Sequence, residues 1–264
     1  MKKEPTLRPE EKVIHLHAEC INFVGLRRKN NEDCLCINEY WLEPGDMNKN
    51  LVCSQDVQQA QALYGVFDGV GGDPHGELAS CGAARYFAEN WREIAEAVAD
   101  RHELIEHFKR ANDAICQMSG DSGTTAVVLL IAHGRAHVLN TGDSRAYLFR
   151  DSVLRPISTE HVFAGEPDAE EAAGRSHVIT RYLGEESEAE LYVPSIGEAI
   201  PLEHGDLFLL CSDGLSDMVS DIQIEAILQN GQDDKKRAEA LVNKAMEAGG
   251  RDNTTVMLVR AQFA

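Results

Sequence analysis

Apolar residues recur along the chain at two spacings, one typical of strands and one typical of helices. Short apolar or alternating runs predict strands at residues 13–23, 63–67, 124–131, 136–140, 146–150, 207–211 and 254–259. A helical repeat of apolar positions predicts helices at residues 77–99, 102–118, 221–229 and 235–248.

The order of these elements indicates the fold class. Two long helices follow one another, a run of strands comes next, and two more helices precede the last strand, which is unlike the alternation of βαβ units. This order predicts an α+β fold with layered, mainly antiparallel sheets. No linker divides the chain, so we expect an N-terminal tail at residues 1–12 and a single domain at 13–264. The acidic segment at 160–177 is interpreted as a flap-like surface excursion, although disorder would explain it equally well.

Composition and charge exclude some partners. The 44 acidic residues outnumber the 25 basic ones and give a net charge of −19. This balance opposes binding to nucleic acid and to anionic membranes, because both use an excess of Lys and Arg. The seven cysteines form no CxxC pair, which favours reduced, mostly buried thiols over disulfides. No apolar run suits a signal peptide or a membrane span. We therefore expect a soluble, cytoplasmic protein, and we expect a monomer.

Four aspartates stand at the ends of apolar strands, beside glycine or asparagine: Asp68, which Gly69 follows, Asp143, Asp213 and Asp252. Each alone is explained as well by a tight turn or a helix cap. Together they are the oxygen donors that Mg²⁺ or Mn²⁺ requires. Zinc prefers closely spaced His and Cys, and none of the ten histidines has that arrangement.

A locally basic segment at residues 25–33 precedes two further carboxylates. It contains Arg28, Glu32 and Asp33. An arginine fork is suited to holding two phosphate oxygens at once. Taken alone, however, the segment is explained at least as well by an exposed charged turn.

The order and the residues of these segments resemble those of the PP2C-type (PPM) metal-dependent protein serine/threonine phosphatases, especially the compact bacterial members. The resemblance extends from the first predicted strand to the C-terminus. The matching strings are RKNNED at 28–33, VFDGVGG at 66–72, GELAS at 76–80, GTTAVVLL at 123–130, NTGDSRAYLFR at 140–150, HVITRYLG at 177–184, LLCSDGLSDMVSD at 209–221 and RDNTTVMLV at 251–259.

The resemblance implies two packed antiparallel sheets flanked by helix pairs, and a site for two Mn²⁺ or Mg²⁺ ions. Asp68 would bridge both ions, and the carbonyl of Gly69 would bind one of them, partly through water. Asp213 and Asp252 would complete the shell of the second ion.

The resemblance also assigns the remaining candidates. Asp33, with Glu32 beside it, would hold water ligands of the first ion, and Asp143 would bind a third, weaker ion. Arg28 would grip the substrate phosphate. Such a site would activate a water to hydrolyse phosphoserine or phosphothreonine on proteins, with no phosphoenzyme intermediate.

The sequence departs from the family pattern in two ways: it lacks a histidine proposed as the general acid, and the acidic stretch at 162–176 is shorter than the usual bacterial flap. Val70 stands where some members carry a histidine proposed as the general acid, so leaving-group protonation must have another source. His161 matches a T-x-D-H string in which Glu160 replaces the aspartate. A role for His161 near the site and a place on the surface are equally good explanations.

Two other functions remain open. A pseudophosphatase acting as a binding module would share the fold, but it would be expected to lose one of Asp33, Asp68, Asp213 and Asp252. A metal-dependent nuclease or phosphodiesterase could also use two ions, although the net charge opposes it.

Overall fold

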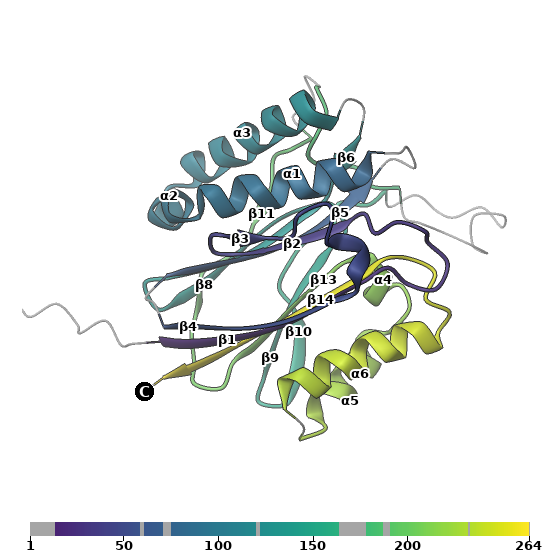
Figure 1. The fold of residues 1–264 in the computed structure, drawn as a ribbon. Helices are drawn as coiled ribbons and strands as arrows, with labels where there is room; N and C mark the ends of the chain where they lie inside the picture. Colours follow the sequence, from purple (N-terminus) through teal and green to yellow (C-terminus); the bar gives the residue numbers. More distant parts are fainter. Residues whose placement is uncertain are drawn as a thin grey trace, which may run out of the picture.

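The molecule consists of two β-sheets packed face to face, with helices on both outer faces (Figure 1). The computed structural model describes residues 14–58, 61–70, 75–119, 122–163, 178–186, 191–231 and 233–263. The pairings between its named strands are antiparallel, which confirms the predicted fold class. The predicted tail at residues 1–12 and most of the predicted flap, residues 164–177, lie outside the described residues.

The first sheet has six strands in the order β10-β9-β13-β14-β1-β4. These strands are β1 (Ile14–Phe23), β4 (Leu51–Gln58), β9 (Arg145–Arg150), β10 (Val153–Pro156), β13 (Leu207–Cys211) and β14 (Thr254–Phe263). The central strands β1 and β14 pair along their whole length, with Phe23 opposite Thr254. The loops that follow Phe23 and precede Thr254 therefore meet at one end of the sheet.

The second sheet has eight strands. Six follow the order β11-β8-β7-β5-β2-β3, while β12 pairs with β8 and β6 with β5. They are β2 (Asp33–Ile37), β3 (Tyr40–Trp41), β5 (Ala62–Val70), β6 (Gly123–Thr124), β7 (Ala126–Ala132), β8 (Arg135–Thr141), β11 (Ser195–Ile196) and β12 (Ile200–Pro201). Strand β7 is apolar throughout and buried at every position, because the other sheet and the helices cover its two faces.

One group of helices covers each outer face (Figure 1). The second sheet carries α1 (Gly76–Glu89), α2 (Trp91–Glu96), the 3₁₀ turn η2 (Ala97–Ala99) and α3 (Arg101–Ser119). The first sheet carries α5 (Asp221–Gln229) and α6 (Asp234–Glu247), and a short α4 (Asp213–Ser216) follows β13. A further 3₁₀ turn, η1 (Met47–Lys49), precedes β4. No helix in the described ranges is long and apolar enough to span a bilayer.

The predicted helix at 77–99 is wrong as one continuous element, because it ends at Asn90 and restarts. The Asn90 side chain donates from Nδ2 to the carbonyl of Tyr86 at 2.8 Å, and its backbone N–H donates to the same carbonyl at 3.1 Å. An asparagine side chain that bonds to the local backbone in this way competes with helical hydrogen bonds.

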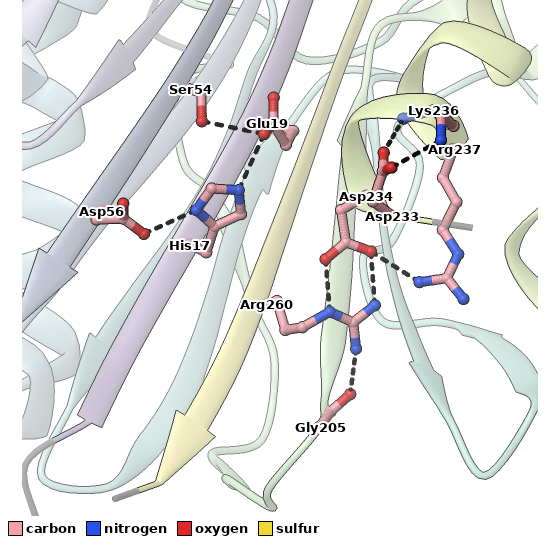
Figure 2. A network of polar contacts seen from close by, with 10 residues as sticks. All are labelled: His17, Glu19, Ser54, Asp56, Gly205, Asp233, Asp234, Lys236, Arg237 and Arg260. Carbon is pink, nitrogen blue, oxygen red and sulfur yellow. Dashed lines mark hydrogen bonds and ion pairs between the residues drawn. The ribbon is translucent and has the colours of Figure 1, made fainter. Parts of the chain in front are cut away.

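Polar pairs anchor the α6 side of the first sheet (Figure 2). Arg260 of β14 donates from Nε and Nη2 to the two carboxylate oxygens of Asp234, the first residue of α6, at 2.5 and 2.6 Å. Burial raises the pKa of Asp234, but the bonds from Arg260 and Arg237 prevail and hold it below its usual value. This bidentate pair fixes the start of α6 on the sheet.

Several strands were missed, most of them because they carry little apolar signal. Strand β4 forms an edge and alternates exposed with partly buried residues, so polar side chains such as Ser54 and Asp56 are tolerated there. Strands β3, β11 and β12 have two residues each, which is too short for any periodicity. The five-residue strand β2 was also missed, and it proves important because it carries Asp33.

Candidate metal centre

Strands β2 and β5 bring two aspartates side by side. The antiparallel register places Asp33, the first residue of β2, directly opposite Asp68. Asp68 was predicted to follow its strand, but it lies inside β5, which continues to Val70. Side chains of directly opposed residues lie close together on the same face of a sheet, so these two carboxylates are neighbours.

Asp33 is completely buried. Its Oδ2 accepts hydrogen bonds from the hydroxyls of Ser212 and Thr255, both at 2.7 Å. Its Oδ1 is buried with no hydrogen-bond partner among the described residues. Burial raises the pKa of Asp33 to about 7, although the two hydroxyls oppose this change. A buried carboxylate oxygen without a donor is costly unless a cation satisfies it.

Asp68 is held through its backbone. Its N–H donates to Oγ1 of Thr125 at 3.1 Å, and its carbonyl accepts from the N–H of Thr125 at 2.8 Å and from Oγ1 of Thr124 at 2.9 Å. Its side chain interacts with that of Asp33. Burial, followed by the charges of four other aspartates, raises the pKa of Asp68 well above its usual value; the four are Asp33, Asp213, Asp143 and Asp252.

Asp213 is the first residue of α4, directly after β13. Its Oδ1 is buried with no hydrogen-bond partner in the described part of the chain. Burial, then the charges of Asp143 and Asp252, raise its pKa well above the usual value. The next residue must be glycine, because a Cβ on Gly214 would lie 1.9 Å from the carbonyl oxygen of Asn253. This close contact places Asp213 beside the loop that carries Asp252.

Asp143 lies in the turn between β8 and β9 and is buried. The preceding Gly142 has a φ of +101°, which favours glycine. A Cβ there would also lie 2.6 Å from Cγ2 of Thr125, the residue that holds the Asp68 backbone. The turn with Asp143 is therefore packed directly against the support of Asp68.

Gly69 is a point of close backbone approach. A Cβ there would lie 2.5 Å from the carbonyl oxygen of Gly76 and 3.0 Å from that of Glu32. Its N–H donates to the Glu32 carbonyl at 3.1 Å. A glycine is needed at this position because two other segments lie too close for a side chain.

Arg28 lies at the edge of the acidic group. Its Nη2 donates to Oδ2 of Asp252 at 2.7 Å, and its Nη1 lies 3.8 Å from Oε2 of Glu32. The side chain is 45% exposed, so the guanidinium remains accessible to a ligand. The bond to Asp252 is the largest cause of the raised pKa of Arg28. Burial is the largest cause of the raised pKa of Glu32, and the charge of Arg28 lowers it.

Asn253 connects the loop that carries Asp252 with the segment at residues 24–32. Its Nδ2 donates to the carbonyls of Val24 and Asn30, both at 2.9 Å, and its Oδ1 accepts from the N–H of Glu32 at 2.8 Å. The supporting residues that sequence reasoning missed are Asn253, Ser212, Thr255 and Thr125. Each one adjoins a predicted acid or lies in a matching string, and that adjacency was the available signal.

His161 is buried rather than on the surface, with 8% of the residue exposed. Its Nδ1 accepts from the N–H of Gly142 at 3.1 Å, and its Nε2 lies 2.8 Å from Oγ of Ser195. Burial, and next the charge of Arg181, lower the pKa of His161 to about 4. It is therefore neutral near physiological pH and contacts the turn that carries Asp143.

The donor set fits a hard divalent cation. All the candidate ligands offer oxygen, as Mg²⁺ and Mn²⁺ prefer, and the buried Oδ1 atoms of Asp33 and Asp213 lack hydrogen-bond donors. Within the described ranges, no group of three or more His, Cys, Asp or Glu side chains could hold an ion as they stand. The geometry explains this, because Asp252 is turned toward Arg28 and Oδ2 of Asp33 toward two hydroxyls. Ion binding would need a shift of these side chains.

Comparisons with known proteins show the family of the chain. The family model "Protein phosphatase 2C" matches residues 36–168. The chain is 33% identical over 261 residues to the serine/threonine phosphatase stp of Listeria monocytogenes, covering 92% of this chain and 95% of that one. It is 31% identical over 251 residues to the protein phosphatase PhpP of Streptococcus pneumoniae, covering 89% of this chain and 94% of that one.

Comparison with solved structures indicates the same family. The Mycobacterium tuberculosis phosphatase PstP superimposes with a TM-score of 0.71 at 29% identity, covering 94% of this chain and 99% of that one. A structure of the PstP catalytic domain in complex with two manganese ions gives a TM-score of 0.70 at 28% identity, with the same coverage. The chain therefore belongs to the protein phosphatase 2C family of metal-dependent serine/threonine phosphatases.

Proposed function

We propose that this protein hydrolyses phosphoserine and phosphothreonine monoesters on proteins, using a water activated by two divalent cations and no phosphoenzyme intermediate. The observation that carries the proposal is the group of four aspartates around Asp68, whose pKa is raised first by burial and then by their charges. Such a group is stable with all its carboxylates ionised only if cations neutralise it. The bound ions would lower the pKa of a water and offset charge on the phosphoryl oxygens.

Each of the acids would bind one or both of the ions. Asp68, facing Asp33 across β5 and β2, would contact both ions, and the carbonyl of Gly69 would reach one of them. Asp213 and Asp252 would complete the shell of the second ion. The contact between Gly214 and the Asn253 carbonyl supports this, because it keeps α4 and the Asp252 loop together.

The first ion would depend on Asp33 and, through water, on Glu32. The Ser212 and Thr255 hydroxyls would orient Asp33 so that its Oδ1 is directed to the ion or to its water ligands. Asp143 would bind a third, weaker ion. Its place in a turn against Thr125 supports a site that is close to the core pair but separable from it.

Arg28 would bind the substrate phosphate. Its guanidinium is partly exposed and carries donors beyond the one that bonds Asp252. A planar fork can hold two phosphoryl oxygens in a fixed geometry. When Asp252 turns to an ion, the Nη2 donor of Arg28 would also become available to the phosphate. We further propose that the domain spans residues 13–264 and acts as a cytoplasmic monomer on phosphoproteins rather than on nucleic acid.

The test is a phosphatase assay with Mn²⁺ on p-nitrophenyl phosphate and on a phosphothreonine peptide. We expect Mn²⁺-dependent release of phosphate from both, reduced to background in Asp68→Asn. The exposed Glu198 offers a control, since Glu198→Gln removes the same charge at a distance and should keep full activity. Activity of the wild type no higher than that of Asp68→Asn would indicate a binding module. Cleavage of bis-(p-nitrophenyl) phosphate but not of the phosphopeptide would indicate a phosphodiesterase.

A further inference from the structure

His161 joins two parts of the molecule that are distant in sequence. Its backbone N–H donates to the carbonyl of Gly142 at 2.9 Å, while the N–H of Gly142 donates back to the His161 ring at Nδ1. The two residues thus form a closed pair of bonds. Gly142 directly precedes Asp143, so these two hydrogen bonds fix the turn that carries Asp143 to His161.

The neighbouring hydrogen-bond partners decide the protonation state of the His161 ring. The N–H of Gly142 is a donor only, so Nδ1 must accept and carries no hydrogen. A neutral imidazole then has its hydrogen on Nε2, which donates to Oγ of Ser195 on β11 at 2.8 Å. Both ring nitrogens therefore have partners, and neither is directed at the aspartate group as a proton donor.

The opposite side of the turn is fixed by Thr125. Its Cγ2 would lie 2.6 Å from a Cβ on Gly142, and its Oγ1 lies 2.7 Å from Oγ of Ser144. The same Oγ1 accepts from the backbone N–H of Asp68. Asp143 is consequently held between Thr125, which supports Asp68, and the pair of hydrogen bonds between His161 and Gly142, which we call the His161 clamp.

His161 also lies where two further chain segments, 161–163 and 178–180, contact each other. The carbonyl of His161 accepts from the N–H of Thr180 at 2.8 Å, and Val162 forms a bridge with Ile179. Chain segments 161–163 and 178–180 therefore meet at the residue that grips the Asp143 turn.

We propose that His161, through the bond from the Gly142 N–H to its Nδ1, is a positioning residue that sets the place of Asp143 and thereby the affinity of the weaker cation site. The inference rests on the proposed function for the role of Asp143 as a ligand. The core pair, built on Asp33, Asp68, Asp213 and Asp252, is supported by other bonds and should not depend on the clamp.

Four variants separate the contacts of the ring. In His161→Asn, the amide oxygen can take the place of Nδ1 and accept from Gly142. In His161→Gln, the amide nitrogen can take the place of Nε2 and donate to Ser195, but the acceptor for Gly142 is lost. His161→Ala loses both contacts, and Ser195→Ala removes only the acceptor of Nε2–H.

The readouts are calorimetric Mn²⁺ titration and the Mn²⁺ dependence of turnover. Loss of one hydrogen bond predicts a Kd for the weakest site raised by about 3- to 10-fold in His161→Gln and His161→Ala. The two tighter sites and KM for a phosphopeptide should be unchanged. His161→Asn should stay close to wild type. An equal loss of Mn²⁺ affinity at the weakest site in His161→Asn and His161→Ala would refute the positioning role. Weakening of all the cation sites together would also refute it.

Metal-free protein provides a test that is independent of catalysis. NMR of uniformly nitrogen-labelled protein should show the Nε2–H form of His161 and a nitrogen–nitrogen coupling between its Nδ1 and the Gly142 amide. This measurement needs no variant to fold. The Nδ1–H form would refute the clamp. Failure of the proposed function would instead appear as wild-type protein without Mn²⁺-dependent activity but with this coupling intact.

Discussion

Replacing Asp33 by Asn should stabilise the metal-free protein at alkaline pH and remove its response to Mn²⁺. The carboxyl is fully buried, and its pKa is raised to about 7. The amide oxygen of Asn can still accept from Ser212 and Thr255, which both bond to one oxygen of Asp33. The change therefore removes a buried charge while it preserves the hydrogen bonds.

The sign follows from proton binding. Between the unfolded pKa of Asp and the folded value near 7, the folded state binds more protons than the unfolded state, so the stability of the wild type falls as pH rises. One pKa unit corresponds to about 1.4 kcal/mol, so the step from about pH 5.5 to pH 7 costs the wild type about 2 kcal/mol. The variant lacks this loss. For a chain of this size, about 2 kcal/mol is roughly 4 to 8 °C in Tm.

The assay is thermal unfolding in a chelator at about pH 5.5 and about pH 8. The Tm advantage of Asp33→Asn over wild type should grow by several degrees between the two conditions. Glu198→Gln makes the same change in net charge at an exposed position and should show no such growth. Mn²⁺ at about 100 times its Kd should stabilise the wild type by about 2.7 kcal/mol and the variant by much less. An equal Tm difference at both pH values would refute the reasoning.

Three further predictions concern the other parts of the site. Arg28→Ala removes a charge-assisted contact and should raise KM for phosphopeptides by about 10- to 100-fold, with little change in Mn²⁺ affinity; lost Mn²⁺ binding at unchanged KM in a calorimetric and kinetic comparison would contradict it. Asp143→Ala should slow turnover while calorimetry still detects two bound Mn²⁺ ions, and a stoichiometry below two would show that the sites are not separable. Gly214→Ala places a Cβ 1.9 Å from the Asn253 carbonyl oxygen and should lower the free energy of unfolding by at least about 1 to 3 kcal/mol, measured by denaturant titration; an unchanged midpoint would mean that the two loops can separate freely.

Much of the fold could be predicted from hydrophobic spacing. Strands β1, β5, β7, β8, β9, β13 and β14 and the helical segments were recognised, because these elements are buried and their apolar periodicity is strong. The edge strand β4 and the two-residue strands β3, β11 and β12 escaped, since they have few buried apolar positions, whereas β2 escaped although all five of its residues are buried. The break at Asn90 escaped for a different reason: the apolar repeat continues through it, and the break depends on the hydrogen bonds of one side chain.

The sequence by itself determined the chemistry of the candidate site, since it supplies the aspartates, the arginine and the glycines in a family order. Tertiary structure alone decided which of them meet. The β2–β5 register makes Asp33 a neighbour of Asp68, and burial raises the Asp33 pKa. A carboxylate's environment is the sum of contacts from distant segments, so no local pattern reveals it. The same holds for His161, whose sequence context allowed a surface residue and whose contacts place it on the Asp143 turn.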